Sequence, residues 1–177
     1  MALRVSDVMI SHEEIQAMCK RMGAEITRDY QGKELLLVAV LRGAFVFMAD
    51  LIRYIDLPCR VDFMKVSSYS DGMTTSGEVK ILQDLDENIA GRDVIIVEDI
   101  IDSGLTLYKL RQVLQTRNPN SLAVCAAFDK PDRRRADIFV DYVGKQIPDE
   151  FIVGYGLDYG GLYRNLPDIR YMEDDGE

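Results

Sequence analysis

Four mostly apolar runs of strand length are spaced along the chain. They occupy residues 35–41, 94–97, 121–128 and 138–143. Runs of this kind are typical of strands that are buried on both faces of a parallel sheet. Residues 60–66 and 79–83 are weaker candidates for two further strands.

Three segments between these runs have apolar residues at helical spacing. The first follows Ser11-His12-Glu13-Glu14, a capping box in which Ser11 is the N-cap and Glu14 reaches back to it. Its apolar stripe comprises Ile15, Met18, Cys19, Met22 and Ile26. The other two are expected at residues 44–55 and 106–117. The buried face of the 44–55 helix is expected to comprise Phe45, Met48, Ile52 and Ile55.

Strands that alternate with helices predict an α/β fold with a mostly parallel sheet and right-handed crossovers. The polar, glycine-flanked segment 67–78 has few core-forming residues and is a candidate mobile loop. The glycine- and tyrosine-rich segment 151–171 is expected to be mostly loop with short strands.

The size and charge of the chain narrow its function class. Its 177 residues suit one domain, and its net charge of −9 argues against nonspecific nucleic-acid binding. It has no apolar run of membrane-spanning length and no signal-peptide layout, so we expect a cytoplasmic protein.

The lone histidine, His12, is expected at the surface and argues against a histidine metal site or a Ser-His-Asp triad. The cysteines are expected in the core: Cys19, Cys59 and Cys125.

Residues that could bind a ligand follow the predicted strand that ends at Val97. Two carboxylates, Glu98-Asp99, are followed by the turn Asp102-Ser103-Gly104-Leu105-Thr106 and then by a helix. Ligands of open α/β sheets bind beyond the carboxyl ends of the strands, and a helix N-terminus preceded by glycine and hydroxyl side chains suits a phosphate. The alternative is that Asp102 or Ser103 only caps the helix and that the acidic pair is surface charge.

The whole string from residue 94 to 107 resembles the phosphoribosyl pyrophosphate (PRPP) signature of the type I phosphoribosyltransferases. Further segments, in the family's order, resemble the bacterial hypoxanthine(-guanine) phosphoribosyltransferases. These segments are Leu41-Arg42-Gly43, Val61-Asp62-Phe63-Met64, Ser67-Ser68-Tyr69, Asp129-Lys130-Pro131 and the stretch from Ile147 to Tyr159.

This resemblance implies one domain over residues 1–177. Its core would span roughly 30–145, and a small hood would form from the N-terminal residues and 146–177. It also implies Mg²⁺-dependent transfer of the phosphoribosyl group from PRPP to hypoxanthine, and to guanine, with release of pyrophosphate. The family commonly forms homodimers or homotetramers, so a homo-oligomer is expected.

The resemblance also implies roles for residues around the PRPP signature. Glu98 and Asp99 would hold the ribose hydroxyls, directly or through Mg²⁺, and Asp102 would be the general base. The 5′-phosphate would be wrapped by Ser103, Gly104, Leu105 and Thr106.

Pyrophosphate would be bound by Leu41, Arg42, Gly43 and Arg164, with a cis peptide between Leu41 and Arg42. The base would be bound by Lys130, Phe151, Ile152 and Asp158. Asp158 would also be a ligand of a second Mg²⁺, and Ser68-Tyr69 would form the tip of a mobile loop. Lys130 is a hydrogen-bond donor only, so it favours a 6-oxopurine over adenine.

Three other interpretations remain open from the sequence. The same PRPP site could serve another acceptor, of which xanthine is the hardest to exclude. A PRPP-sensing regulator would need a basic surface, for which Arg133-Arg134-Arg135 is the only cluster. A flavodoxin-like or other nucleotide-binding domain lacks support, because neither GxGxxG nor GxxxxGK[ST] is present.

Overall fold

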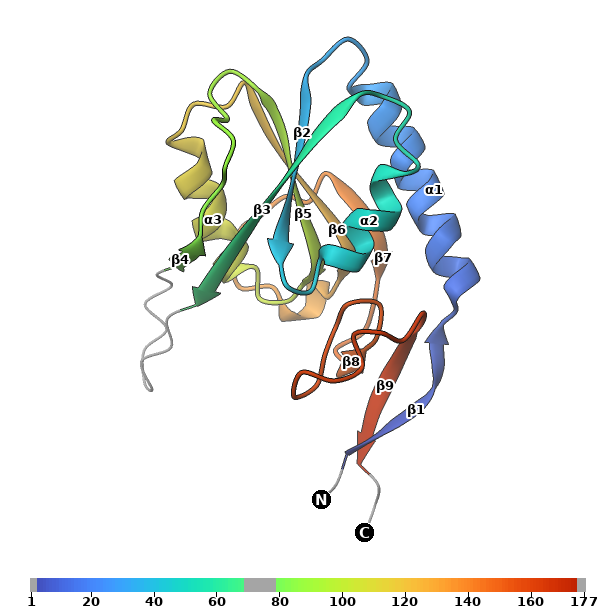
Figure 1. Cartoon of the computed structure of the whole chain (residues 1–177). Helices are drawn as coiled ribbons and strands as arrows, with labels where there is room; N and C mark the ends of the chain where they lie inside the picture. The colour runs from blue at the N-terminus through green and yellow to red at the C-terminus, as the bar shows by residue number, and fades with distance from the viewer. Residues whose placement is uncertain (1–2, 69–78, 175–177) are drawn as a thin grey trace.

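The computed structural model describes residues 3–68 and 79–174, and Figure 1 shows their arrangement. The elements in chain order are β1 (Leu3–Ile10), α1 (His12–Asp29), β2 (Leu35–Leu41), α2 (Phe45–Ile52), β3 (Cys59–Ser68), β4 (Val79–Gln83), β5 (Asp93–Ile101), α3 (Leu105–Gln115), β6 (Ser121–Asp129), the 3₁₀ turn η1 (Pro131–Arg133), β7 (Tyr142–Gln146), β8 (Ile152–Val153) and β9 (Ile169–Asp174).

The larger sheet has six strands in the order β4-β3-β2-β5-β6-β7. All neighbours pair in parallel except β4, which runs antiparallel to β3. The predicted α/β class with a mostly parallel sheet is therefore confirmed. Figure 1 shows α1 and α2 on one side of this sheet and α3 on the other.

Alternation along β2 shows how the sheet is buried on both faces. Leu35, Leu37 and Ala39 belong to the core under α1 and α2. Leu36 and Val38 belong to the core under α3. Successive strand residues point to opposite faces, so a strand covered on both sides must be apolar at every position.

The first helix matches its predicted cap and stripe. The Ser11 side chain accepts a hydrogen bond from the Glu14 amide at 3.1 Å, and all five residues of the predicted stripe are buried. His12 is exposed, as expected. Cys19 and Cys125 are buried, whereas Cys59 is only partly buried, so its assignment to the core was too strong.

The second helix is shorter than expected and buries a different face. It ends at Ile52, and its buried residues are Phe47, Met48 and Leu51, whereas Phe45 is 45% exposed. Ile55 is buried but lies beyond the helix. Almost every residue of this helix is apolar, so periodicity could not identify the face that packs on the sheet.

The last strand of the large sheet begins later than expected, at Tyr142 rather than near residue 138. Ile138 and Val140 instead lie in a loop and pack against the core under α3. Asp141 fixes the end of that loop, because its amide donates to the Val124 carbonyl and its carboxylate accepts from the Val124 amide. Only the end of the predicted run is therefore strand, and Phe139 within it is 73% exposed.

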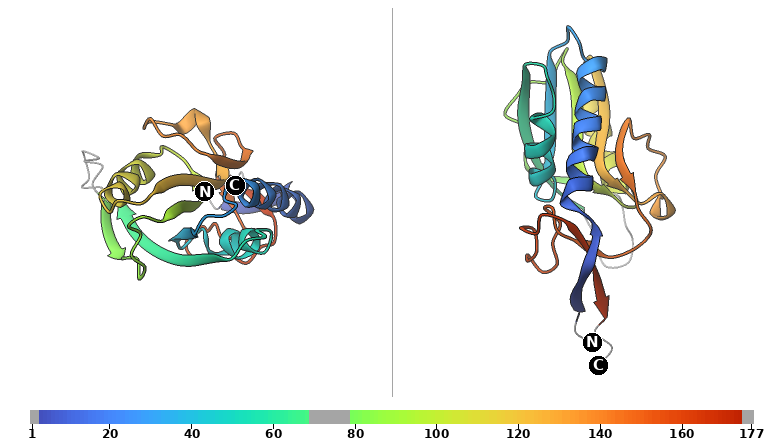
Figure 2. Two further views of the ribbon diagram at one scale, coloured as in Figure 1. Left: turned by 90° about the horizontal axis from the view of Figure 1, so that it is seen from above. Right: turned by 90° about the vertical axis from the view of Figure 1, so that its right-hand side faces the viewer.

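The two ends of the chain build a second sheet, in the order β1-β9-β8, with antiparallel pairing. Both views in Figure 2 place the two ends together, and the right-hand view shows this sheet beyond one end of the core. The strand β1 was not predicted, because its partner β9 lies at the opposite end of the sequence. No helix among the described residues is long and apolar enough to cross a membrane.

Candidate active site

The candidate residues gather where β2, β5 and β6 end, at the edge of the large sheet that faces the small one (Figure 1). β2 leads into Leu41-Arg42-Gly43, β5 carries Glu98-Asp99, and β6 leads into Lys130. Parallel strands place their carboxyl ends at one edge, so three segments far apart in sequence meet there.

The acidic pair lies within β5, which extends to Ile101 rather than ending near Val97. Neighbouring strand residues point to opposite faces, so the two carboxylates have different surroundings. Glu98 lines a pocket of about 260 Å³ together with Asp102, Ser103 and Gly104. Asp99 faces the other side, where it lies against Gly43.

Burial shapes the acidity of this pair. Burial raises the pKa of Glu98 well above its usual range, and the neighbouring Asp99 charge raises it further. Burial also raises the pKa of Asp99 to about 6, although the Ile100 amide and the nearby Arg164 oppose that shift. Both shifts disfavour the charged forms of the carboxyls, so a cation or hydroxyl donors would stabilise the ionised pair.

Gly43 is the point where two strand ends come closest. A Cβ at Gly43 would lie 1.6 Å from Oδ2 of Asp99, so no other residue fits without moving that carboxylate. The peptide between Leu41 and Arg42 is cis, as predicted. The Arg42 side chain is exposed.

The turn after β5 leaves backbone amides available for a ligand. Gly104 is the N-cap of α3 with φ of 78°, a conformation that favours glycine. The first helical hydrogen bond runs from the Tyr108 amide to the Gly104 carbonyl at 2.9 Å, so the amides of residues 105–107 precede the helical ladder. The Leu105 amide reaches the Ser103 hydroxyl at 3.3 Å. The turn therefore has the form of an anion cradle.

The Asp102 side chain makes no capping hydrogen bond to this helix. Its Oδ1 accepts a hydrogen bond from Nε of Arg133 at 2.9 Å. Arg133 also reaches Asp149, with 3.5 Å between Nη1 and Oδ2. Asp149 lies 4.0 Å from Nζ of Lys130, so four charged residues form a chain from the turn to the base side of the site.

The candidate base-binding residues lie at the other end of this chain. Lys130 is 7% exposed, although it is a lysine. Phe151 is 51% exposed and meets Tyr159 edge to face at 5.7 Å, which argues against core packing as its role. Ile152 is buried in β8, directly after Phe151.

Asp158 and Arg164, which the resemblance assigns to the second Mg²⁺ and to pyrophosphate, form an ion pair. Nη2 of Arg164 lies 3.0 Å from Oδ1 of Asp158, and its Nη1 donates to the Gly156 carbonyl at 2.6 Å. The Gly161 amide donates to Asp158 at 2.8 Å. Both charged side chains influence the pKa of Asp99, which places them close to the acidic pair.

The lid residues are only partly within the described structure. Ser68 is the last residue of β3, where it pairs with Val79 of β4. Tyr69 and almost all of the expected loop 67–78 lie outside the described residues.

The carboxylates of the candidate site limit how a metal ion could bind. Among the residues with described positions, no group of three or more acidic, cysteine or histidine side chains could hold a metal ion. Mg²⁺ is usually held by one or two carboxylates together with substrate phosphates and water. Glu98 and Asp99 for one ion, and Asp158 for a second, fit that pattern, in which the substrate supplies the remaining oxygens.

Sequence reasoning missed Arg133 and Asp149, which join the turn to the base side. Asp149 lies within a segment that resembles the family, and Arg133 lies within the basic cluster, but neither was given a role. Arg133 and Asp102 are 31 residues apart. A single sequence contains no signal for pairing across that separation.

Comparison with known proteins identifies the family. Residues 10–160 match the model of the phosphoribosyl transferase domain. A hypoxanthine-guanine phosphoribosyltransferase from Staphylococcus aureus is 52% identical over 165 residues, which cover 93% of this chain and 92% of that protein. A hypoxanthine phosphoribosyltransferase from Salmonella typhimurium is 56% identical over 163 residues, which cover 91% of this chain and 92% of that protein.

Solved structures agree in fold. The crystal structure of a hypoxanthine phosphoribosyltransferase from Staphylococcus aureus matches with a TM-score of 0.93 and 51% identity, covering 96% of this chain and 92% of that chain. A hypoxanthine-guanine phosphoribosyltransferase from Bacillus anthracis matches with a TM-score of 0.92 and 47% identity, covering 98% and 100%. The expected type I fold is confirmed, and this chain belongs to the phosphoribosyl transferase family, within its hypoxanthine(-guanine) phosphoribosyltransferase branch.

Proposed function

We propose that this enzyme transfers the 5-phosphoribosyl group of PRPP to hypoxanthine and guanine, giving IMP or GMP and pyrophosphate. One observation carries the proposal. The acidic pair of β5 and the anion cradle at the start of α3 lie at the same edge of the sheet as the buried Lys130, which follows β6. These features supply a sugar-phosphate site and a base site at one edge of one sheet.

The sugar phosphate would bind around the pocket lined by Glu98 and the turn. The amides at the start of α3, with the side chains of Ser103 and Thr106, would take the 5′-phosphate, because helix N-termini favour anions. Glu98 and Asp99 would hold the ribose hydroxyls, which can donate to these carboxylates.

Pyrophosphate would leave toward Gly43, Arg42 and Arg164. The planar fork of Arg164 suits phosphate oxygens, and Arg42 is exposed beside Gly43. Glu98 and Asp99 would hold one Mg²⁺, directly or through the ribose hydroxyls, and Asp158 would hold a second. These ions would neutralise charge on the leaving pyrophosphate. Local cations are needed because the chain as a whole carries a net charge of −9.

The base would be oriented by Lys130 and Phe151. The Lys130 ammonium would donate to the 6-oxo group, and the exposed Phe151 ring would stack on the purine. Asp102 would accept the proton that the purine loses as its nitrogen attacks the anomeric carbon. Its pairing with Arg133 holds the carboxylate at the mouth of the site.

We further propose that a loop beginning at Tyr69, directly after Ser68 at the end of β3, closes over the reacting centre, and that the enzyme is a cytoplasmic homo-oligomer. Closure would exclude water from an activated ribose. Light scattering coupled to size-exclusion chromatography tests the oligomer, and a monomer at micromolar concentration would contradict it.

Turnover of five bases with PRPP and Mg²⁺ tests the function directly. We expect efficient use of hypoxanthine and guanine. We expect little use of adenine, because Lys130 cannot accept a hydrogen bond from its amino group. Little use of uracil is expected because the segment Phe151 to Asp158 resembles that of the purine-using branch of the family. Xanthine is the fifth base. A clear preference for adenine or uracil would overturn the assignment, and preferred use of xanthine would change the named acceptor.

A further inference from the structure

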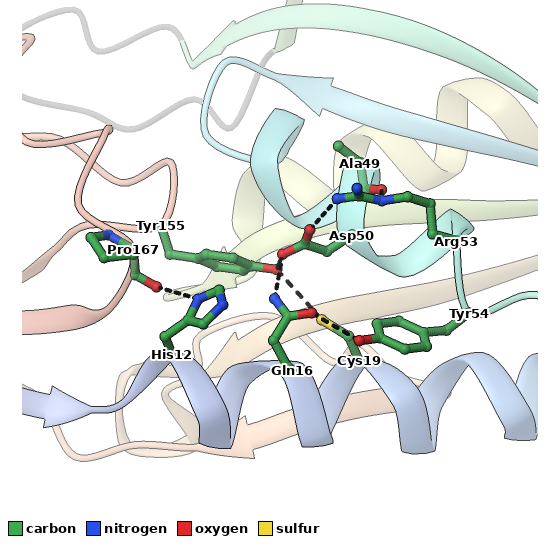
Figure 3. A network of polar contacts seen from close by, with 9 residues as sticks. All are labelled: His12, Gln16, Cys19, Ala49, Asp50, Arg53, Tyr54, Tyr155 and Pro167. Carbon is green, nitrogen blue, oxygen red and sulfur yellow. Dashed lines mark hydrogen bonds and ion pairs between the residues drawn. The ribbon is translucent and has the colours of Figure 1, made fainter.

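A partly buried carboxylate outside the active site joins three parts of the fold. Asp50 lies on α2, and its side chain is 14% exposed. Its Oδ2 accepts from the Gln16 amide group of α1 at 2.9 Å and from the Tyr155 hydroxyl at 2.6 Å, while Arg53 binds its Oδ1 at 2.6 Å. Figure 3 shows these side chains converging from both helices and from the segment that follows β8.

The network continues beyond Asp50. The Tyr54 hydroxyl donates to the Gln16 side-chain carbonyl at 2.9 Å, and the Cys19 sulfur lies 3.4 Å from the Tyr155 hydroxyl. Burial raises the pKa of Tyr155 far above its usual range, so the phenol keeps the proton that it donates to Asp50. None of these residues has a part in the proposed chemistry.

Tyr155 occupies an unusual backbone position. Its φ is 49°, and the flanking Gly154 and Gly156 have φ of 100° and 95°. A bulky residue with positive φ persists only where surrounding contacts hold it. Tyr155 is 3% exposed, and its hydroxyl is bound by Asp50, so its side chain supplies such contacts.

The backbone beside Tyr155 forms the wall of the pyrophosphate end. The Gly156 amide donates to the Arg164 carbonyl at 3.0 Å, and the Gly156 carbonyl accepts from the Arg164 guanidinium. A Cβ at Gly156 would lie 2.4 Å from the Gly43 carbonyl, so the two glycine backbones are in close contact. Asp158 follows two residues later and pairs with Arg164.

We propose that the Asp50–Tyr155 hydrogen bond fixes the position of residues 154–158 against Gly43. This position aligns Asp158 and Arg164 to bind pyrophosphate and its metal ion. The inference rests on the proposed function and deepens it. Asp50 and Tyr155 are positioning residues, because they act through Gly156, Asp158 and Arg164 rather than on substrate. Phe151 is held separately, since its carbonyl accepts from the Met172 amide of β9.

The Tyr155→Phe variant removes only the hydroxyl and tests this inference. We expect the KM for PRPP, and the KM for pyrophosphate in the reverse reaction, to rise about tenfold, because small misplacements of binding groups are costly. The KM for hypoxanthine should change less than about twofold, because Lys130 and Phe151 are held by other contacts.

Tyr142→Phe is a matched control. The Tyr142 hydroxyl also donates to a carboxylate, Asp29, at 2.8 Å, and the residue is also buried, but it lies on β7 away from the site. This variant should leave every KM unchanged. Thermal unfolding of both variants shows whether any stability loss is shared.

Asp50 provides an independent pair of variants. Asp50→Asn keeps an oxygen that accepts from Tyr155, so it should retain a KM for PRPP closer to that of the parent enzyme than Asp50→Ala does. Asp50→Ala combined with Tyr155→Phe should be no worse than Asp50→Ala alone, because both remove one interaction.

Three results would overturn the inference. They are an unchanged KM for PRPP and pyrophosphate in folded Tyr155→Phe, an equal rise in the KM for hypoxanthine, or the same change in Tyr142→Phe. If Tyr155→Phe does not fold, equal behaviour of Asp50→Asn and Asp50→Ala would overturn it. An inactive parent enzyme would instead contradict the proposed function.

Discussion

The turn after β5 and the segment after β8 face the same site but are held in different ways. Residues 98–106 form a continuous strand, turn and helix, and their shape comes from backbone bonds, including the pairing of β5 with β6, and from Gly104. Residues 154–158 also make backbone bonds, but they belong to no helix or long strand and are tied in addition to side chains of α1 and α2 through Tyr155. One edge of the sheet therefore combines a part shaped by regular secondary structure with a part that side-chain packing also fixes.

This difference predicts how substitutions act. Changes in the β5 turn should act directly on bound substrate, whereas changes around the β8 segment should act through position. We expect the effect of Tyr155→Phe to be smaller than that of Asp102→Asn and larger than that of Arg133→Gln.

Asp102→Asn should give the largest loss. An amide cannot accept the purine proton, so we expect kcat to fall by about 10²- to 10⁴-fold. PRPP binding, measured by calorimetry with Mg²⁺, should stay within about threefold because the phosphate cradle consists mainly of backbone amides. Equal losses in kcat and PRPP affinity would assign Asp102 to binding or folding instead.

Gly43→Ala tests the contact between Gly43 and Asp99. The added Cβ would collide with Oδ2 of Asp99, so kcat/KM for PRPP should fall by about 100-fold as that carboxylate moves. Gly32→Ala is the control, because it meets no atom within 4 Å but has a φ of 74°. It should lower thermal stability without changing KM, and an equal kinetic effect at Gly32 would contradict the contact argument.

Lys130→Met should act on the base side. Loss of a buried charged donor costs about 1.5–3 kcal/mol, so kcat/KM for hypoxanthine should fall roughly 10- to 100-fold. The KM for PRPP should change little. Steady-state kinetics with each substrate varied in turn measures both values, and a larger effect on PRPP would remove Lys130 from the base site.

Arg133→Gln should have the smallest effect. The Arg133 and Asp102 side chains are both about half exposed, at 51% and 50%, and exposed ion pairs contribute at most about 1 kcal/mol. We expect kcat/KM to change by no more than about fivefold, and the difference from the parent enzyme should shrink at high salt. A much larger, salt-independent loss would show that Arg133 takes part in catalysis.

The elements with strong local signals could be predicted from the sequence alone. The cap at Ser11, the strand at 35–41 and the Glu98 to Thr106 string are contiguous patterns. The first two occur as expected, and the third forms the expected strand, turn and helix, although the strand extends to Ile101 and includes the acidic pair. The same string and the segments that resemble the family indicated the chemistry. Local signals suffice there because backbone geometry and short-range hydrogen bonds act between sequence neighbours.

The buried face of α2, the start of β7 and the pairing of β1 with β9 could not be predicted from the sequence, because they depend on tertiary packing. Tertiary packing also decided the contacts of Asp102 with Arg133 and of Asp50 with Tyr155, which are 31 and 105 residues apart in sequence. Such contacts depend on how the helices and the small sheet pack on the core. Packing is settled by interactions between distant residues, and the pattern of one sequence does not record them.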